Sequence, residues 1–121
     1  MTNFKEFVNG IEIWLDDERD PNDPFVQKEF HSRPGMIWVK TADKAIELLN
    51  GGNVSYLSFD HDLGLGQTGY DVAKYIEEQA FNGKLSRLMW AVHSANTVGQ
   101  KNIIFAMKKA EEFWSQNEKK S

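Results

Sequence analysis

The chain has 121 residues and no cysteine, and its 18 acidic and 14 basic residues give a net charge of −4 at pH 7. This length fits one domain, and the lack of cysteine excludes disulfides, thiol nucleophiles and cysteine-bound zinc. The acidic balance argues against binding a long nucleic acid through its phosphates, so we expect a ligand that is small or bridged by a metal ion. The apolar runs are too short to span a membrane, and the first residues lack the apolar stretch of a signal peptide. We therefore expect a single cytoplasmic domain over residues 1–121.

Short apolar runs alternate along the chain with segments of helical periodicity. Continuous apolar runs of this length are typical of strands covered on both faces, as in a parallel sheet. The helical segments are bounded by capping residues and glycines. In chain order, the runs are residues 11–15, 36–39, 54–59 and 88–92, and the helical segments are 24–31, Thr41 to Gly51, Thr68 to Gly83 and Thr97 to Trp114.

Strands that alternate with helices form right-handed βαβ units and hence a parallel sheet, so we predict an open α/β fold. Asn9-Gly10 is also typical of a hairpin turn, which would pair Phe4 to Val8 beside the first strand, but we favour the parallel arrangement. Thr97 and Gln100 fit a capping box, and the lysine-rich residues 115–121 are predicted to fray. The four tryptophans are expected to pack in the core.

Polar residues gather where the predicted strands end. In open α/β sheets ligands bind beyond the carboxyl ends of the strands, and in a parallel sheet these ends share one rim. We therefore expect the residues that follow the strands to form the functional site. They are Asp16 and Asp17 after the first strand, Asp60, His61 and Asp62 after the third, and His93, Ser94 and Asn96 after the fourth.

The residue types at this rim indicate two kinds of chemistry. Asp16, Asp17 and Asp60 offer the hard oxygen ligands that Mg²⁺ prefers, although paired aspartates are also common in solvated turns. Two imidazoles, His61 and His93, can serve as acid and base because histidine titrates near neutral pH.

Phosphate contacts are expected from neutral donors and one cation at the same rim. Ser94, Asn96 and Asn102 can donate to phosphate oxygens, and Arg19 can bind a phosphate with two hydrogen bonds. Each also has an ordinary structural explanation, as a helix cap or as an ion-pair partner of a nearby aspartate.

Asp16-Asp17, Asp60 and Ser94 resemble the receiver domain of response regulators. In that family the paired acids bind Mg²⁺, the aspartate after the third strand accepts a phosphoryl group, and a Ser or Thr contacts the phosphate. Receivers also have a fifth strand with a lysine. This chain ends after the helix that follows the fourth strand, which argues against a phosphorelay role.

A closer resemblance is to the cyclic-phosphate-processing receiver-like domain, a family met in phage and bacterial conflict settings. It is carried by residues 14–21, 57–64 and 92–96, with Gly99 and Asn102 following. The resemblance implies a three-layer, flavodoxin-like α/β fold with four parallel strands in the order 2-1-3-4 and no fifth strand. The apolar fourth strand would then lie at an edge, which either the N-terminal segment or the last helix would shield, or where two chains would associate as a homodimer.

The resemblance implies action on a cyclic or terminal phosphate of a nucleotide or RNA end, and a phosphoesterase is our leading hypothesis. The alternatives are a module that binds a nucleotide signal without chemistry and a degenerate receiver used for protein interaction. The site assignments are His61, His93, Asp60 and Asp62 for catalysis, Ser94, Asn96, Asn102 and Arg19 for phosphate binding, and Asp16, Asp17 and Asp60 for a divalent metal ion such as Mg²⁺.

Overall fold

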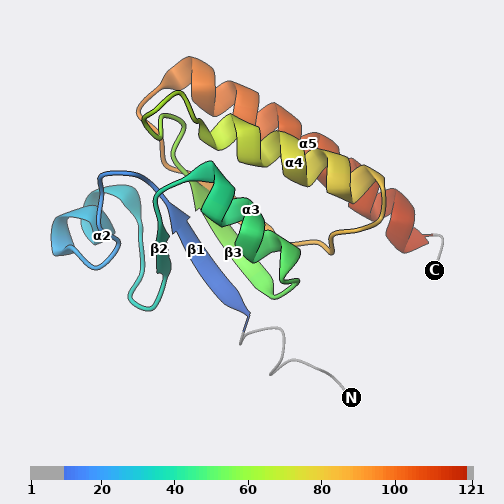
Figure 1. The fold of residues 1–121 in the computed structure, drawn as a ribbon, viewed down its shortest axis with the longest axis horizontal. Coiled ribbons are helices and arrows are strands. Elements are labelled where there is room, and N and C mark those ends of the chain that lie inside the picture. The colour runs from blue at the N-terminus through green and yellow to red at the C-terminus, as the bar shows by residue number, and fades with distance from the viewer. Residues whose placement is uncertain (1–9, 120–121) are drawn as a thin grey trace.

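The computed structural model describes residues 10–119, which form a parallel sheet with helices on both faces (Figure 1). The strands lie in the order β2-β1-β3-β4, and each neighbouring pair is parallel. Both the predicted fold class and the strand order are thereby confirmed. Along the chain the elements are β1 (Ile11–Leu15), α2 (Pro24–Phe30), β2 (Ile37–Val39), α3 (Ala42–Asn50), β3 (Val54–Phe59), α4 (Gly69–Phe81), β4 (Met89–Val92) and α5 (Thr97–Lys119).

Side chains alternate between the two faces of the sheet, and each face has its own apolar cluster. Ile13 and Leu15 of β1 belong to the larger cluster, which packs under α3, α4 and α5. Figure 1 shows these three helices side by side on one side of the sheet. Trp14, between those two residues, packs with Val26 of α2 in the smaller cluster on the opposite face. The continuous apolar run of β1 is therefore explained by burial on both faces.

The helix starts follow the expected capping chemistry at two of three places. The side chains of Thr41 and Thr68 accept hydrogen bonds from the third backbone N–H after them, and Thr68 completes a capping box with Asp71. The capping box predicted at Thr97 and Gln100 is wrong. The N–H of Gly99 instead donates to Oδ1 of Asn96, so the helix is capped one residue earlier.

The end of the last helix also differs from the prediction. Residues 115–119 were expected to fray, but α5 continues through them to Lys119. Side-chain contacts fix these turns, because Arg87 donates to Ser115 and forms an ion pair with Glu118. Asn117 also donates to the backbone carbonyl of Ala80, at the end of α4.

β4 lies at the edge of the sheet, where it pairs with β3 alone among the described strands. Met89 is 60% exposed there. Association of two chains through this edge stays a prediction, and the hairpin considered for Phe4 to Val8 falls outside the described residues. No helix within residues 10–119 is long and apolar enough to cross a membrane.

Candidate functional site

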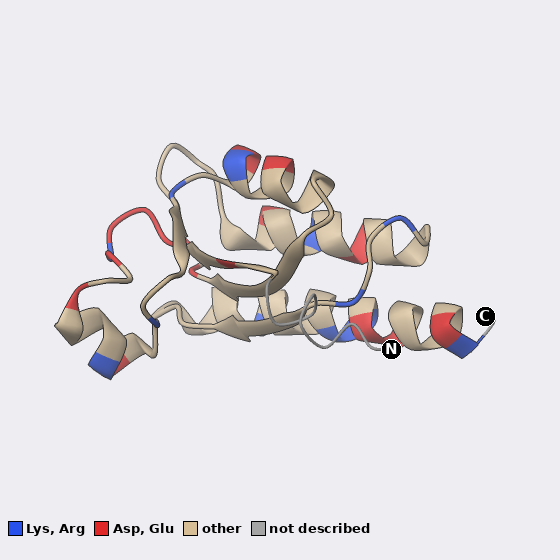
Figure 2. Cartoon of the chain, turned by 90° about the horizontal axis from the view of Figure 1, so that it is seen from below, with Lys and Arg blue, Asp and Glu red and all other residues tan. Residues whose placement is uncertain are grey.

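The carboxyl ends of β1, β3 and β4 surround a hollow of about 350 Å³. Residues 16–20, directly after β1, are acidic except for Arg19 (Figure 2). A larger depression of about 500 Å³ lies on α4 and Phe113, away from the strand ends. We place the candidate site at the strand ends because residues from three strands converge there. The hollow is lined by Asp17, Glu18, Arg19, Asp60, Asp62, Gly64, Ser94, Ala95 and Asn96.

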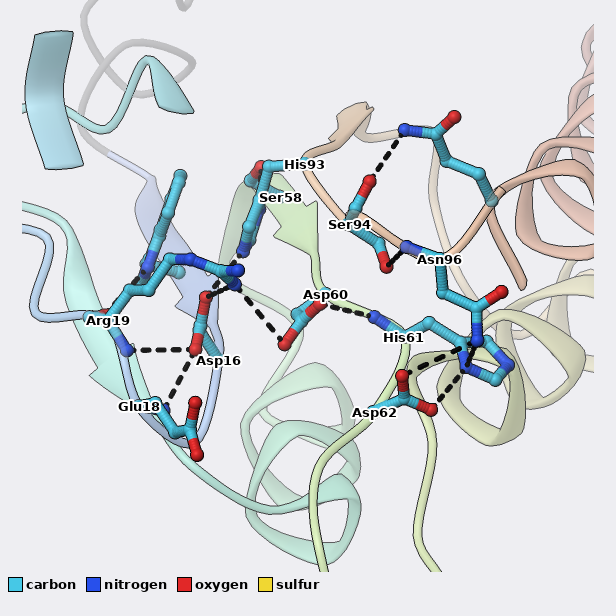
Figure 3. A network of polar contacts seen from close by, with 12 residues as sticks. Asp16, Glu18, Arg19, Ser58, Asp60, His61, Asp62, His93, Ser94 and Asn96 are labelled. Carbon is cyan, nitrogen blue, oxygen red and sulfur yellow. Dashed lines mark hydrogen bonds and ion pairs between the residues drawn. The ribbon is translucent and has the colours of Figure 1, made fainter. Parts of the chain in front are cut away.

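Asp16 lies beneath this hollow, fully buried, and both of its carboxylate oxygens are engaged (Figure 3). Oδ1 accepts from the backbone N–H groups of Glu18 and Arg19, at 2.8 and 2.9 Å. Oδ2 lies 3.0 Å from Nη1 of Arg19 and 3.0 Å from Nε2 of His93. Burial alone would raise the pKa of Asp16, but the hydrogen bonds from His93, Arg19 and Glu18 outweigh it and lower the pKa from 3.8 to about 2.

His93 is held in the interior instead of facing the hollow. Its Nε2 meets Asp16, and its Nδ1 lies 2.8 Å from the hydroxyl of Ser58. The imidazole also stacks on the indole of Trp14, with ring centroids 3.7 Å apart and planes 6° apart. Both ring nitrogens are therefore occupied by protein groups, and the ring is placed to position Asp16 more than to touch a ligand.

Ser58 is a member of this network that the sequence did not single out. It lies within β3 and is 2% exposed. A polar residue inside an otherwise apolar strand run was the available signal, because a buried hydroxyl needs a hydrogen-bond partner. The partner of Ser58 is His93, and the pairing of β3 with β4 brings the two together. In this pairing Ser58 lies opposite Ala91, two residues before His93.

Asp60 differs from Asp16 in having one oxygen with only a distant partner. Its Oδ1 accepts from the backbone N–H of His61 at 2.8 Å, whereas Oδ2 lies 3.7 Å from Nη1 of Arg19. Burial raises the pKa of Asp60, and the negative charge of Asp16 raises it further. The lowering contributions come from the His61 N–H and from the charges of His93 and Arg19. A carboxylate with a raised pKa that lines a hollow suits proton transfer.

The three aspartates predicted to bind a metal ion are brought together. One ligand atom of each of Asp16, Asp17 and Asp60 lies within 4.8 Å of the others, so the cluster could hold a metal ion. The donors suit a hard cation such as Mg²⁺, but the fit is uneven because hydrogen bonds already engage both oxygens of Asp16. No protein group within residues 10–119 hydrogen-bonds the carboxylate of Asp17, which lines the hollow.

His61 and Asp62 form a second histidine–carboxylate contact at the margin of the hollow. Nδ1 of His61 lies 2.9 Å from Oδ1 of Asp62, and Asn96 Nδ2 lies 3.4 Å from Asp62 Oδ2. Hydrogen bonds from His61 and Asn96 lower the pKa of Asp62. No group in the described part of the chain bonds Nε2 of His61, which leaves this atom open to a ligand. The ring lies over Gly99, where a Cβ atom would come within 2.3 Å of it.

The expected phosphate donors are only partly assembled. Arg19, Ser94 and Asn96 line the hollow, but Asn102 is exposed on α5 and does not. Asn96 caps α5, and the Oγ of Ser94 accepts from the N–H of Asn96 at 3.0 Å. The Ser94 hydroxyl hydrogen and the Arg19 guanidinium are therefore the donors best placed for an anion.

The comparison with protein families agrees with this arrangement. Residues 11–109, which contain every residue of the site, match the model of the cyclic-phosphate processing receiver domain. No curated protein and no solved structure gives a significant match. Because the matched region covers most of the chain and all four strands of the sheet, the protein belongs to the cyclic-phosphate processing receiver domain family.

Proposed function

We propose that this protein is a phosphoesterase that hydrolyses a cyclic or terminal phosphate on a nucleotide or an RNA end. The observation that carries the proposal is the hollow in which the Arg19 guanidinium faces Asp60 at the rim of the sheet. A guanidinium attracts a phosphate, and a nearby carboxylate with a raised pKa can accept a proton from water. The family description supplies the class of substrate.

The residues that line the hollow and His61 at its margin divide the reaction between them. Arg19 and Ser94 bind non-bridging oxygens of a cyclic phosphodiester. As a water oxygen bonds to phosphorus, the water proton passes to Asp60, and the bond from phosphorus to one ring oxygen breaks. The imidazolium of His61 gives its Nε2 proton to that leaving oxygen, while Asp62 holds the other ring nitrogen. The product is a phosphomonoester with a free hydroxyl.

A divalent cation held by Asp16, Asp17 and Asp60 would neutralise phosphate charge and would take over from Asp60 the activation of water. His93 is assigned a positioning role, since its side chain is only 4% exposed and both of its nitrogens already have partners. This divides the two histidines that the sequence treated alike. His61 serves as the acid, and His93 keeps Asp16 in place.

The test is incubation of the protein with 2′,3′-cyclic nucleotides, 3′,5′-cyclic nucleotides and cyclic oligonucleotides, with and without Mg²⁺, followed by mass spectrometry. We expect a product heavier by one water. Asp60→Asn and His61→Ala should each lower turnover by about 10²-fold or more, whereas Asp43→Asn, on the exposed first turn of α3, should not. Full turnover by a folded Asp60→Asn variant would contradict the proposal.

A non-catalytic binding module is the second candidate, and one observation favours it. Neither His61 nor His93 is among the residues that line the hollow, so the hollow itself holds an arginine and carboxylates without an imidazole. A module of this kind would bind one member of the same panel and release it unchanged on denaturation. Ligand recovered without added water, at full occupancy, would select it over the enzyme.

A degenerate receiver is the remaining candidate, in which Asp60 accepts a phosphoryl group. The Asp60 side chain is 9% exposed and lines the hollow, so a small phosphodonor is the suitable probe. Stoichiometric phosphorylation of the wild type, absent from Asp60→Asn, would favour this role.

A further inference from the structure

The two buried carboxylates of the site have no oxygen that is free of both the backbone and Arg19. On each of them, one oxygen accepts only backbone N–H groups: Asp16 from Glu18 and Arg19, and Asp60 from His61. The other oxygen of each faces the same atom, Nη1 of Arg19, at 3.0 Å from Asp16 and 3.7 Å from Asp60, and this oxygen of Asp16 also lies 3.0 Å from Nε2 of His93. One guanidinium nitrogen thus bridges the pair (Figure 3).

Arg19 is held at this bridging position by contacts of its side chain and of its backbone. Its guanidinium carbon lies 4.3 Å from the ring centroid of Phe30, at the end of α2. Its backbone carbonyl accepts from the indole N–H of Trp14 at 3.0 Å, and its N–H donates to Asp16. The side chain remains 27% exposed, so the guanidinium can leave the pair toward the solvent of the hollow.

A metal ion would need the same two oxygens that face Arg19. Backbone donors hold the other oxygens at 2.8 to 2.9 Å, and they cannot move without opening the loops that follow β1 and β3. Two cations attracted to the same oxygens compete for them. The contact of Nη1 with the oxygen of Asp60 is also the longer one, which makes it the first to be lost.

We propose that Arg19 is a built-in counter-cation that competes with a divalent metal ion for Asp16 and Asp60, and that metal binding releases its guanidinium to hold an anionic ligand. This inference rests on the proposed function for its ligand class. It makes the metal ion and the anion bind cooperatively, since each favours the arrangement in which Arg19 has left the carboxylates.

The first test measures Mn²⁺ affinity by electron paramagnetic resonance in the wild type and in Arg19→Gln. We expect Mn²⁺ to bind Arg19→Gln about fivefold or more tightly than the wild type, the lower end of typical coupling between linked sites. Arg33→Gln is the matched control, because Arg33 also pairs with a carboxylate, Glu12, and stacks on an aromatic ring, Tyr56, but lies outside the hollow. An equal gain in both variants, no gain, or no Mn²⁺ binding to any form would overturn the proposal.

The second test needs no variant, so it decides the question even where Arg19→Gln fails to fold. In a Mg²⁺ titration of the wild type followed by NMR, the Nε–H resonance of Arg19 and the ring resonances of Phe30 should shift together. The Nε–H resonance of Arg33 should stay in place. Mg²⁺-dependent shifts at Asp17 and Asp60 with Arg19 and Phe30 unmoved would overturn the competition.

The tests of the Arg19 proposal can be distinguished from the test of the proposed function. Competition is read from metal binding and from resonances, neither of which requires turnover. Added inorganic phosphate is the anion probe: with Mg²⁺ present it should bind the wild type several-fold more tightly than without Mg²⁺, and Arg19→Gln should lose this gain. Hydrolysis without competition between Arg19 and the metal ion would support the proposed function and overturn the role of Arg19. Competition without hydrolysis would support the role of Arg19 and overturn the proposed function.

Discussion

The site contains two histidine–carboxylate pairs, which have similar nitrogen–oxygen distances but differ greatly in burial. In the buried pair, His93 and Asp16 lie 3.0 Å apart with side chains that are 4% and 0% exposed. In the open pair, His61 and Asp62 lie 2.9 Å apart with side chains that are 16% and 70% exposed. The same two chemical groups thus meet once in the interior and once at the edge of the hollow.

Burial gives the two pairs different tasks. Desolvation makes every polar atom of the buried pair require a partner, and Ser58, Arg19 and two backbone N–H groups supply them. Water can supply partners to the open pair, so Nε2 of His61 is left without a protein group among the described residues. The comparison indicates that the buried pair maintains the shape of the site, whereas the open pair is available for proton transfer.

The largest expected effect comes from breaking the buried pair. Asp16→Asn replaces an oxygen acceptor by an amide group and removes the charge that faces Arg19 and His93. We expect the free energy of unfolding to fall by about 3–5 kcal/mol, as for other buried pairs that lose one partner. Urea unfolding followed by tryptophan fluorescence measures it. Asp17→Asn, one residue later and partly exposed, is the control and should change stability by less than about 0.5 kcal/mol.

The contrast between the pairs explains how far the sequence predicts this site. Each residue that directly follows a strand is placed at the rim by the parallel sheet alone, so Asp16, Asp60 and His93 could be found from the apolar runs. The depth of each side chain could not, because it depends on neighbours from other strands. His93, which follows β4, is buried because Trp14 of β1, two strands away in the sheet, stacks on its ring.

Two other differences from the prediction have separate causes, one local and one long-range. Thr97 and Asn96 are both residue types that cap helices well. The structure uses Asn96, and the side chain of Gln100 donates to the Ser94 carbonyl instead of joining a capping box with Thr97. The last turns of α5 are fixed by Arg87, which lies 28 residues before Ser115 in the chain. Local patterns predict which elements form, but they do not contain these pairings.

The second prediction uses pH to separate Asp16 from Asp60. The pKa of Asp16 falls from 3.8 to about 2 on folding, so its stabilisation is complete above pH 3.8 and is lost as the pH falls through 2. The loss amounts to about 2 kcal/mol. The raised pKa of Asp60 has the opposite sign, because its ionised form destabilises the fold at neutral pH.

Stability should therefore rise slightly as the pH is lowered from neutral toward 4, and then fall steeply. Urea unfolding from pH 7 to pH 2, in a chelating buffer, measures this profile. Asp60→Asn should abolish the rise and keep the acid loss. A wild-type stability that falls steadily from pH 7 would contradict the opposite signs of the two carboxylates.

A smaller effect is expected from Ser58→Ala, which removes the hydroxyl that meets Nδ1 of His93. A lost buried hydrogen bond of this kind lowers the free energy of unfolding by about 1 kcal/mol. Ser58→Thr keeps the hydroxyl and should restore most of the loss. Ser55→Ala on the same strand is the control, since its hydroxyl makes a single, longer bond of 3.3 Å to the Ile11 carbonyl. Equal losses at Ser55 and Ser58 would show that the link to His93 has no special role.

The smallest effect on stability should come from the open pair, where we expect turnover to fall while the free energy of unfolding hardly changes. Asp62 is 70% exposed, so Asp62→Asn should change the free energy of unfolding by less than about 0.5 kcal/mol. Turnover of a cyclic phosphate should still fall by about tenfold, because His61 loses the carboxylate that holds its Nδ1 and orients the ring. A variant that is destabilised as strongly as Asp16→Asn would show that exposure does not divide the two pairs, and an unchanged turnover would remove the open pair from the reaction.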